Sequence, residues 1–152
     1  MTTDSPYLNP GRLADVLAAI QAMATNPDYR QSVQEWAYFL SGSRAEDHVE
    51  RWQKVFDEHS EFFRPSVIAP GHYGLLLRRS MPEVDSPGRV EVRPPIETAD
   101  LKVLLDVALN LHRQAVEAQA DKRWWLPIVV PFTGSLMGAI IGAVSTLLLK
   151  PN

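Results

Sequence analysis

Apolar residues return every three or four positions in three stretches of the first half of the chain. The stretches are residues 10–23, 27–40 and 46–63, and such spacing gives a helix one apolar face to bury against its neighbours. The apolar positions of the third stretch are Val49, Trp52, Val55, Phe56, Phe62 and Phe63. We therefore expect three packed helices.

Helix-capping signals separate these stretches. Asn26-Pro27 places a capping side chain before a proline, the residue that suits the first position of a helix. Gly42 is expected to end the second helix. Ser43 and Glu46 have the spacing of a capping box, in which each side chain accepts a hydrogen bond from a backbone N–H at the helix start.

The pattern changes after the third stretch. Residues 66–69 and 73–79 are two short, mostly apolar runs separated by Pro70-Gly71, and this arrangement is typical of a β-hairpin. Residues 81–97 are rich in proline, glycine and charge. We expect them to form a wing loop that continues into a linker.

A fourth helix is predicted over residues 98–123, with Thr98 as its N-cap. One apolar row has the spacing of a coiled-coil seam and comprises Leu101, Leu104, Ala108, Leu111, Ala115 and Ala118. A second row beside it comprises Leu105, Leu109 and Val116. Two rows are more than a solvated helix needs, so this helix packs either on the preceding domain or on copies of itself.

Residues 124–149 contain no charged residue and no histidine. A helix rises about 1.5 Å per residue and the apolar interior of a bilayer is about 30 Å thick, so these 26 residues are enough to cross it. The alternative is a buried helix of a soluble core, but a domain of this size rarely holds a charge-free run of that length. We expect one transmembrane helix.

Residues suited to a membrane surface flank this segment. They are Lys122, Arg123, Trp124, Trp125 and Lys150, and both aromatic rings and cations favour the headgroup level. More basic residues precede the segment than follow it, and positive charge is retained on the cytoplasmic side. We therefore expect a single-pass protein of the cell membrane, with its larger part in the cytoplasm.

Gly134, Gly138 and Gly142 are spaced by four residues and share one face of the expected transmembrane helix. Glycine lets two helix backbones approach closely, and close packing stabilises helix association in lipid. Glycine is also common in membrane helices that do not associate. Three glycines in one row favour self-association, so we expect a homo-oligomer.

Composition narrows the possible chemistry. The net charge of the 152 residues is −3, and residues 1–97 hold ten basic and fourteen acidic side chains, a net charge of −4. Such a domain has no general attraction for nucleic acid. There are no cysteines, and the four histidines do not have the spacing of metal ligands. We expect no catalytic, cofactor or metal site, and therefore no enzyme.

Three helices followed by a hairpin resemble the winged-helix arrangement. The resemblance is to bacterial winged-helix-like heads joined to a C-terminal membrane anchor, and it is carried by residues 52–64 (WQKVFDEHSEFFR) and 75–79 (LLLRR). It implies a mainly α fold, with a three-helix winged-helix-like domain and a small β-hairpin. It implies no activity.

The kind of partner follows from the charge of the expected third helix. Arg78 and Arg79 close the expected hairpin, where basic side chains can reach phosphates. Residues 46–61 nevertheless carry more acidic than basic side chains, and these repel a phosphate backbone. We expect a protein partner, and the candidate contact residues are Trp36, Trp52, Phe63, Arg78 and Arg79.

The predicted organisation is a flexible N-terminus (1–8), a cytoplasmic head (9–80), a wing or linker (81–97), a juxtamembrane helix (98–123), a transmembrane helix (124–149) and a tail (150–152). The favoured function is a tail-anchored adaptor that self-associates through its C-terminal helices and recruits a cytoplasmic protein. One alternative is an effector whose transmembrane helices oligomerise and disrupt the membrane when the head is triggered. Another is a membrane-bound transcription regulator, which the acidic third helix disfavours.

Overall fold

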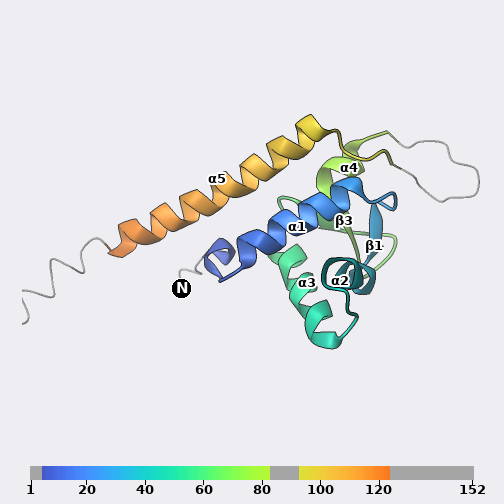
Figure 1. Cartoon of the computed structure of the whole chain (residues 1–152), viewed down its shortest axis with the longest axis horizontal. Coiled ribbons are helices and arrows are strands. Elements are labelled where there is room, and N and C mark those ends of the chain that lie inside the picture. Colours follow the sequence, from blue (N-terminus) through green and yellow to red (C-terminus); the bar gives the residue numbers. More distant parts are fainter. Residues whose placement is uncertain (1–4, 83–92, 124–152) are drawn as a thin grey trace, which may run out of the picture. The chain divides into compact units, whose positions relative to one another are not determined.

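The computed structural model describes residues 5–82 and 93–123. The chain divides into two units, Met1–Arg113 and Gln114–Asn152, and we call the first the head unit. The head unit is mainly helical and contains a small three-stranded antiparallel sheet (Figure 1). Of the second unit, the structure describes residues 114–123, which continue the last helix.

Three helices form the first half of the head unit, as the apolar spacing predicts. They are α1 (Arg12–Thr25), α2 (Val33–Ser41) and α3 (Glu46–Glu58), and a short 3-10 helix, η1 (Pro6–Leu8), precedes them. Gly42 ends α2 in the left-handed conformation, with φ 69°, which glycine adopts without steric cost. The prediction of this helix end is confirmed.

Helices α2 and α3 each begin later than their capping signals predict. The N-cap of α2 is Ser32, whose hydroxyl accepts a backbone hydrogen bond in the first turn. The N-cap of α3 is Ala45, which has no capping side chain. Ser43 Oγ instead accepts a hydrogen bond from Ala45 N at 3.1 Å, so Ser43 stabilises the turn before the helix. The predicted capping box with Glu46 is therefore wrong.

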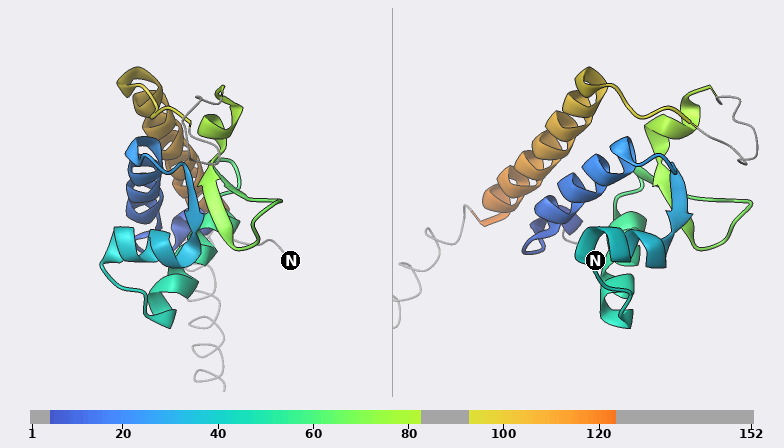
Figure 2. Two further views of the ribbon diagram at one scale, coloured as in Figure 1. Left: turned by 90° about the vertical axis from the view of Figure 1, so that its right-hand side faces the viewer. Right: turned by 45° about the vertical axis from the view of Figure 1, so that its right-hand side comes forward.

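The sheet has the strand order β1-β3-β2, and both pairs are antiparallel (Figure 2). The strands are β1 (Arg30–Ser32), β2 (Phe63–Pro65) and β3 (His72–Leu75). The predicted hairpin is therefore misplaced: residues 66–69 belong to the connecting loop, and the second predicted strand changes into helix α4 (Leu76–Ser80). The short, polar β1 was not predicted.

Aromatic side chains from the helices and the strands meet in the core. Trp36 of α2, Phe56 of α3 and Phe63 of β2 are at most 1% exposed. The ring of Phe56 lies 5.2 Å from that of Phe63 and 5.1 Å from that of Tyr73 on β3. Trp36 Nε1 donates to the carbonyl of Tyr73 at 3.0 Å. The sheet is thus fastened to α2 and α3 through the middle of the core.

Helix α5 (Thr98–Arg123) follows, and its first sixteen residues belong to the head unit. Ala108 of the predicted seam is fully buried, and Leu104 lines an apolar hollow with Phe62 and Leu75. Leu104 and Ala108 of the seam therefore pack within the head unit. Val103 and Leu109 are exposed.

No helix within residues 5–82 and 93–123 is long and apolar enough to cross a membrane. The predicted transmembrane helix (124–149), with Gly134, Gly138 and Gly142, lies outside the described residues. So do the predicted interface residues Trp124, Trp125 and Lys150. Lys122 and Arg123 are the last two residues of α5.

Candidate functional site

An arginine row crosses the outer strands of the sheet. Arg30 of β1 and Arg64 of β2 are both paired with Gly74 of β3. Residues directly opposite one another in neighbouring strands point to the same face of a sheet. The two arginines therefore flank a glycine on one face, and no side chain separates them.

Gly74 is required by the backbone of the neighbouring strand. A Cβ atom at this position would lie 2.8 Å from the carbonyl oxygen of Tyr29, which is closer than two such atoms pack. Tyr29 precedes β1, so glycine lets β1 pair closely with β3. Because the backbone of Tyr29 occupies that space, no side chain of β3 lies between Arg30 and Arg64.

Two further arginines lie beside this row. Arg79 of α4 and Arg93 line a hollow of about 200 Å³ together with Arg30 and Tyr29. Arg93 is held in place because its guanidinium donates to the carbonyl of Arg79 at 2.6 Å and also to that of Met81. Its charged carbon lies 5.2 Å from the centre of the Tyr29 ring.

The loop that joins β2 to β3, residues 66–71, projects from the sheet beside this hollow (Figure 2). Its base is closed by two backbone hydrogen bonds, from Ser66 N to His72 O at 2.8 Å and from His72 N to Ala69 O at 3.1 Å. At its tip Val67 is 82% exposed and Ile68 is 70% exposed. An apolar tip on a hydrogen-bonded base is thus presented to solvent.

We define the loop face as this tip together with the four arginines: Arg30, Arg64, Val67, Ile68, Arg79 and Arg93. Of these, the sequence-based prediction named Arg79 alone, because residues 66–69 had been assigned to a strand. The available signal was the position of Val67 and Ile68, two apolar residues shortly before Pro70-Gly71, where a loop needs none.

Four of the five predicted partner-contact residues are buried, and their assignment to a surface is wrong. Trp36, Phe63 and Arg78 are fully buried and Trp52 is 3% exposed. The aromatic rings belong to the core, and Trp52 Nε1 donates to the hydroxyl of Ser41 at 2.7 Å. Arg79 is exposed, as the prediction requires.

Arg78 joins three separate segments of the chain. Its guanidinium donates hydrogen bonds to five backbone carbonyls, three of them within 2.8 Å, which belong to Met23, Asn26, Pro27, Arg93 and Pro94. Burial lowers the pKa of Arg78, and the carboxylate of Asp28 opposes that effect, but arginine remains charged in proteins. A buried cation therefore fastens the end of α1 and the segment before α5 to α4.

A second buried polar cluster lies at the other end of α1. His59 is fully buried, its Nδ1 lies 3.1 Å from a carboxylate oxygen of Glu61, and the hydroxyl of Tyr7 donates to the same oxygen at 2.7 Å. Burial lowers the pKa of His59, although the nearby Glu61 opposes this. Burial also raises the pKa of Tyr7, as does its bond to Glu61. His112 Nδ1 lies 3.1 Å from the carbonyl oxygen of Tyr7.

This cluster does not form a metal site. Among the described residues, no three histidine, aspartate or glutamate side chains are placed to hold an ion. Tyr7 also has a raised pKa, so its hydroxyl is a poor nucleophile at neutral pH. The contacts of Tyr7, His59 and His112 instead join η1, the end of α3 and α5.

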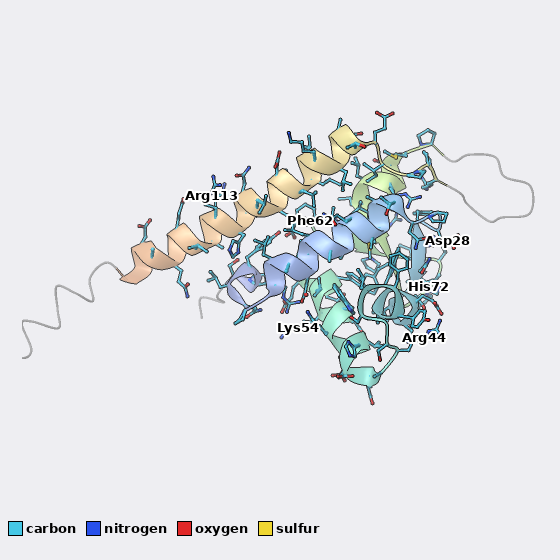
Figure 3. All side chains as sticks on the ribbon, viewed as in Figure 1. Asp28, Arg44, Lys54, Phe62, His72 and Arg113 are labelled. Atoms are coloured by element: carbon cyan, nitrogen blue, oxygen red, sulfur yellow. The ribbon has the colours of Figure 1, made fainter. Side chains whose placement is uncertain are left out.

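Arg30 also lines a polar hollow of about 400 Å³. It is lined by both acidic and basic side chains, among them Asp28, Glu35 and His72, and Figure 3 shows Asp28 and His72 at the same end of the head unit. Glu35 is already bound by Arg44 through both carboxylate oxygens, at 3.0 and 3.1 Å. The mixture of charges specifies no ligand.

Two aromatic side chains of α2 are exposed although their neighbours are buried. Tyr38 is 51% exposed and Phe39 is 58% exposed. The guanidinium of Arg44 lies 4.5 Å from the centre of the Tyr38 ring. Aromatic side chains at a surface are typical of protein contacts.

No protein-family model, curated protein or solved structure matches this chain.

Proposed function

We propose that this protein is a tail-anchored membrane adaptor whose cytoplasmic head recruits a protein partner. The charge-free run of residues 124–149 carries the proposal, because a helix of that length and composition is most stable in a bilayer. Lys122 and Arg123, which end α5, supply the basic residues expected on the cytoplasmic side of such a helix.

The head has a winged-helix-like arrangement in this proposal. The order of elements supports it: one strand lies between α1 and α2, and two follow α3. The antiparallel sheet with order β1-β3-β2 is compatible with that fold. The loop between β2 and β3 is then the wing, and the wing assigned from sequence to residues 81–97 is not needed.

The proposed partner surface is the exposed part of α2 and not the buried aromatic residues. Tyr38 and Phe39 are the exposed aromatic pair of the head unit's described residues, and a partner protein would cover them. Arg44, which packs against Tyr38, marks the position of this surface (Figure 3).

Self-association is assigned to the C-terminal helices. Leu109 and Val116 of α5 are seven residues apart and more than 40% exposed, so they suit a neighbouring helix. The glycine row would continue the contact within lipid. Gly138→Ile places a branched side chain in the middle of that row and should lower the oligomeric state in detergent.

Membrane anchorage is tested by deleting residues 124–152. The full chain should stay in the membrane pellet after alkaline carbonate extraction, and the chain ending at Arg123 should be soluble and helical by circular dichroism. A full chain that carbonate releases would refute the anchor. An unfolded shortened chain would show that the head unit does not form a core of its own.

Partner recruitment is tested by a photo-crosslinking residue placed at Phe39 in cells. A discrete crosslinked protein is expected, and it should be lost when Tyr38 is replaced by alanine. The same probe at Lys54 of α3, whose side chain is 63% exposed, is the matched control. If partner expression instead causes dye leakage that Gly138→Ile abolishes, the membrane-disrupting effector replaces the adaptor.

A further inference from the structure

We propose that the loop face docks on anionic phospholipid, with Val67 and Ile68 entering the membrane interface and the arginines binding lipid phosphates. This inference rests on the proposed membrane anchor, which keeps the head unit close to a bilayer. It assigns the loop face to lipid, and so leaves Tyr38 and Phe39 of α2 for the protein partner.

The tip of the loop has the chemistry of an interfacial anchor. Val67 and Ile68 are the most exposed of the large apolar side chains that the structure describes, at 82% and 70%. The loop sequence Ser66-Val-Ile-Ala-Pro-Gly71 has no charged residue. Apolar groups flanked by cations gain both apolar burial and electrostatic attraction at a membrane with anionic lipid.

Three arginines around the tip, Arg64, Arg79 and Arg93, have the chemistry to bind phosphate. Arg64 and Arg79 are exposed, and no carboxylate among the described residues lies within salt-bridge distance of either. Arg93 donates to two backbone carbonyls, which carry no net charge to neutralise it. The hollow of about 200 Å³ that Arg79 and Arg93 line has room for a phosphate group, which the guanidinium fork binds through two hydrogen bonds.

The same features disfavour nucleic acid. A phosphate backbone rewards positive charge along the whole contact surface, but the tip is apolar. In addition, α3 carries Glu46, Asp47, Glu50, Asp57 and Glu58 against Arg51 and Lys54. A bilayer accepts both an apolar tip and surrounding cations, whereas a duplex accepts only the cations.

The chain has no cysteine, so an introduced cysteine carries an environment-sensitive fluorophore without competing labels. We would label full-length Ile68→Cys in nanodiscs of phosphatidylcholine, with and without phosphatidylglycerol. The expected result is a blue shift and brighter emission in the anionic discs that weaken as salt is raised. The same label at Lys54→Cys, on exposed α3, should stay in water in both lipids.

Charge removal tests the arginines. Arg64→Gln or Arg79→Gln should each lower the ratio of inserted to water-exposed label about fivefold. Arg64→Lys, which keeps the positive charge, should retain most of the wild-type ratio. Arg44→Gln is the matched control. Arg44 is an exposed arginine that follows α2 and is already paired with Glu35. This substitution should leave the ratio unchanged.

Three results would overturn the proposal: a label that stays in water in anionic discs, a blue shift that ignores the arginine substitutions, or a shift produced by duplex DNA instead of lipid. Insertion that appears only after Glu83 and Asp85 are replaced by their amides would likewise assign the arginines to the chain's own acidic residues. Failure of the proposed membrane anchor would give a different result, because the chain would then not insert into discs of neutral lipid. Anionic discs would still recruit it through the loop face and produce the blue shift.

Discussion

Arg78 and Arg79 are neighbours in α4 and belong to two regions with opposite chemistry. The region around Arg78 is closed: the side chain is fully buried and its guanidinium is bonded to five backbone carbonyls. The loop face around Arg79 is open to solvent. The number of hydrogen-bond acceptors around a buried arginine, and not its charge alone, therefore decides whether the residue stabilises the fold. A cation with its donors satisfied inside holds the chain together, whereas an exposed one remains available to a partner.

Replacing Arg78 should have the largest effect. Arg78→Met leaves five carbonyls without their donor and should destabilise the chain ending at Arg123 by about 3–5 kcal/mol. Urea unfolding followed by tryptophan fluorescence measures the change. Arg79→Met is the matched control and should shift the free energy of unfolding by less than about 0.5 kcal/mol. Equal effects would remove the distinction between the two regions.

Trp52→Ala should be nearly as damaging. The ring is 3% exposed and stacks on Phe56 with centres 6.2 Å apart, so its loss should cost about 3–5 kcal/mol. Phe39→Ala removes an aromatic ring that is 58% exposed and should cost far less in the same unfolding experiment. A loss below about 1 kcal/mol for Trp52→Ala would return this residue to the surface, where the sequence-based prediction had placed it.

Gly74→Ala tests the close approach between β1 and β3 beside the loop face. The new methyl group would lie 2.8 Å from the carbonyl of Tyr29, and because that atom is backbone, β1 must move. We expect a loss of about 1–3 kcal/mol. Gly71→Ala is a poor control because Gly71 has φ 76°. Ala69→Gly in the same loop serves better and should change stability only slightly. Wild-type stability in Gly74→Ala would mean that β1 tolerates the displacement.

The smallest expected effect is the pH dependence contributed by His59. Burial lowers the pKa of His59 below its usual 6.5, so the unfolded chain binds a proton more readily than the folded one. Stability from this group is therefore complete above about pH 6.5 and is lost as the pH falls towards the folded pKa. His59→Gln should flatten that part of the stability curve in thermal unfolding between neutral and acidic pH. A curve that keeps its slope would assign it to other groups.

The sequence predicts the helices well and the sheet poorly, for reasons visible in single residues. The apolar faces of α1–α3 follow local periodicity, so their burial could be predicted. Periodicity also defined the seam of α5, but it left open whether that seam packs on the preceding domain or on copies of the helix. β1 consists of Arg30, Gln31 and Ser32, which show no apolar alternation, and pairing with β3 some forty residues later defines it. No local pattern contains that information.

The site is predictable only in part for a similar reason. Tryptophan is common both in contact surfaces and in cores, so residue type alone does not assign Trp36 and Trp52 to either. Only the packing of α2 and α3 against the sheet shows that they belong to the core. The burial of Arg78 depends on carbonyls more than fifty residues away. Exposure of Val67 and Ile68 follows from the position of the turn, which the strand assignment had misplaced by several residues.

The contacts of Arg78 and Arg93 also determine where this chain accepts added sequence. Arg93 bonds to the carbonyls of Arg79 and Met81, and Arg78 bonds to those of Arg93 and Pro94, so the described residues on both sides of positions 83–92 are already joined. Lengthening a closed segment costs only the logarithm of its length, about 0.6 kcal/mol for each doubling. A reporter domain inserted between residues 85 and 90 would therefore leave the core and both chain ends intact, including the C-terminal segment that a terminal fusion would obstruct.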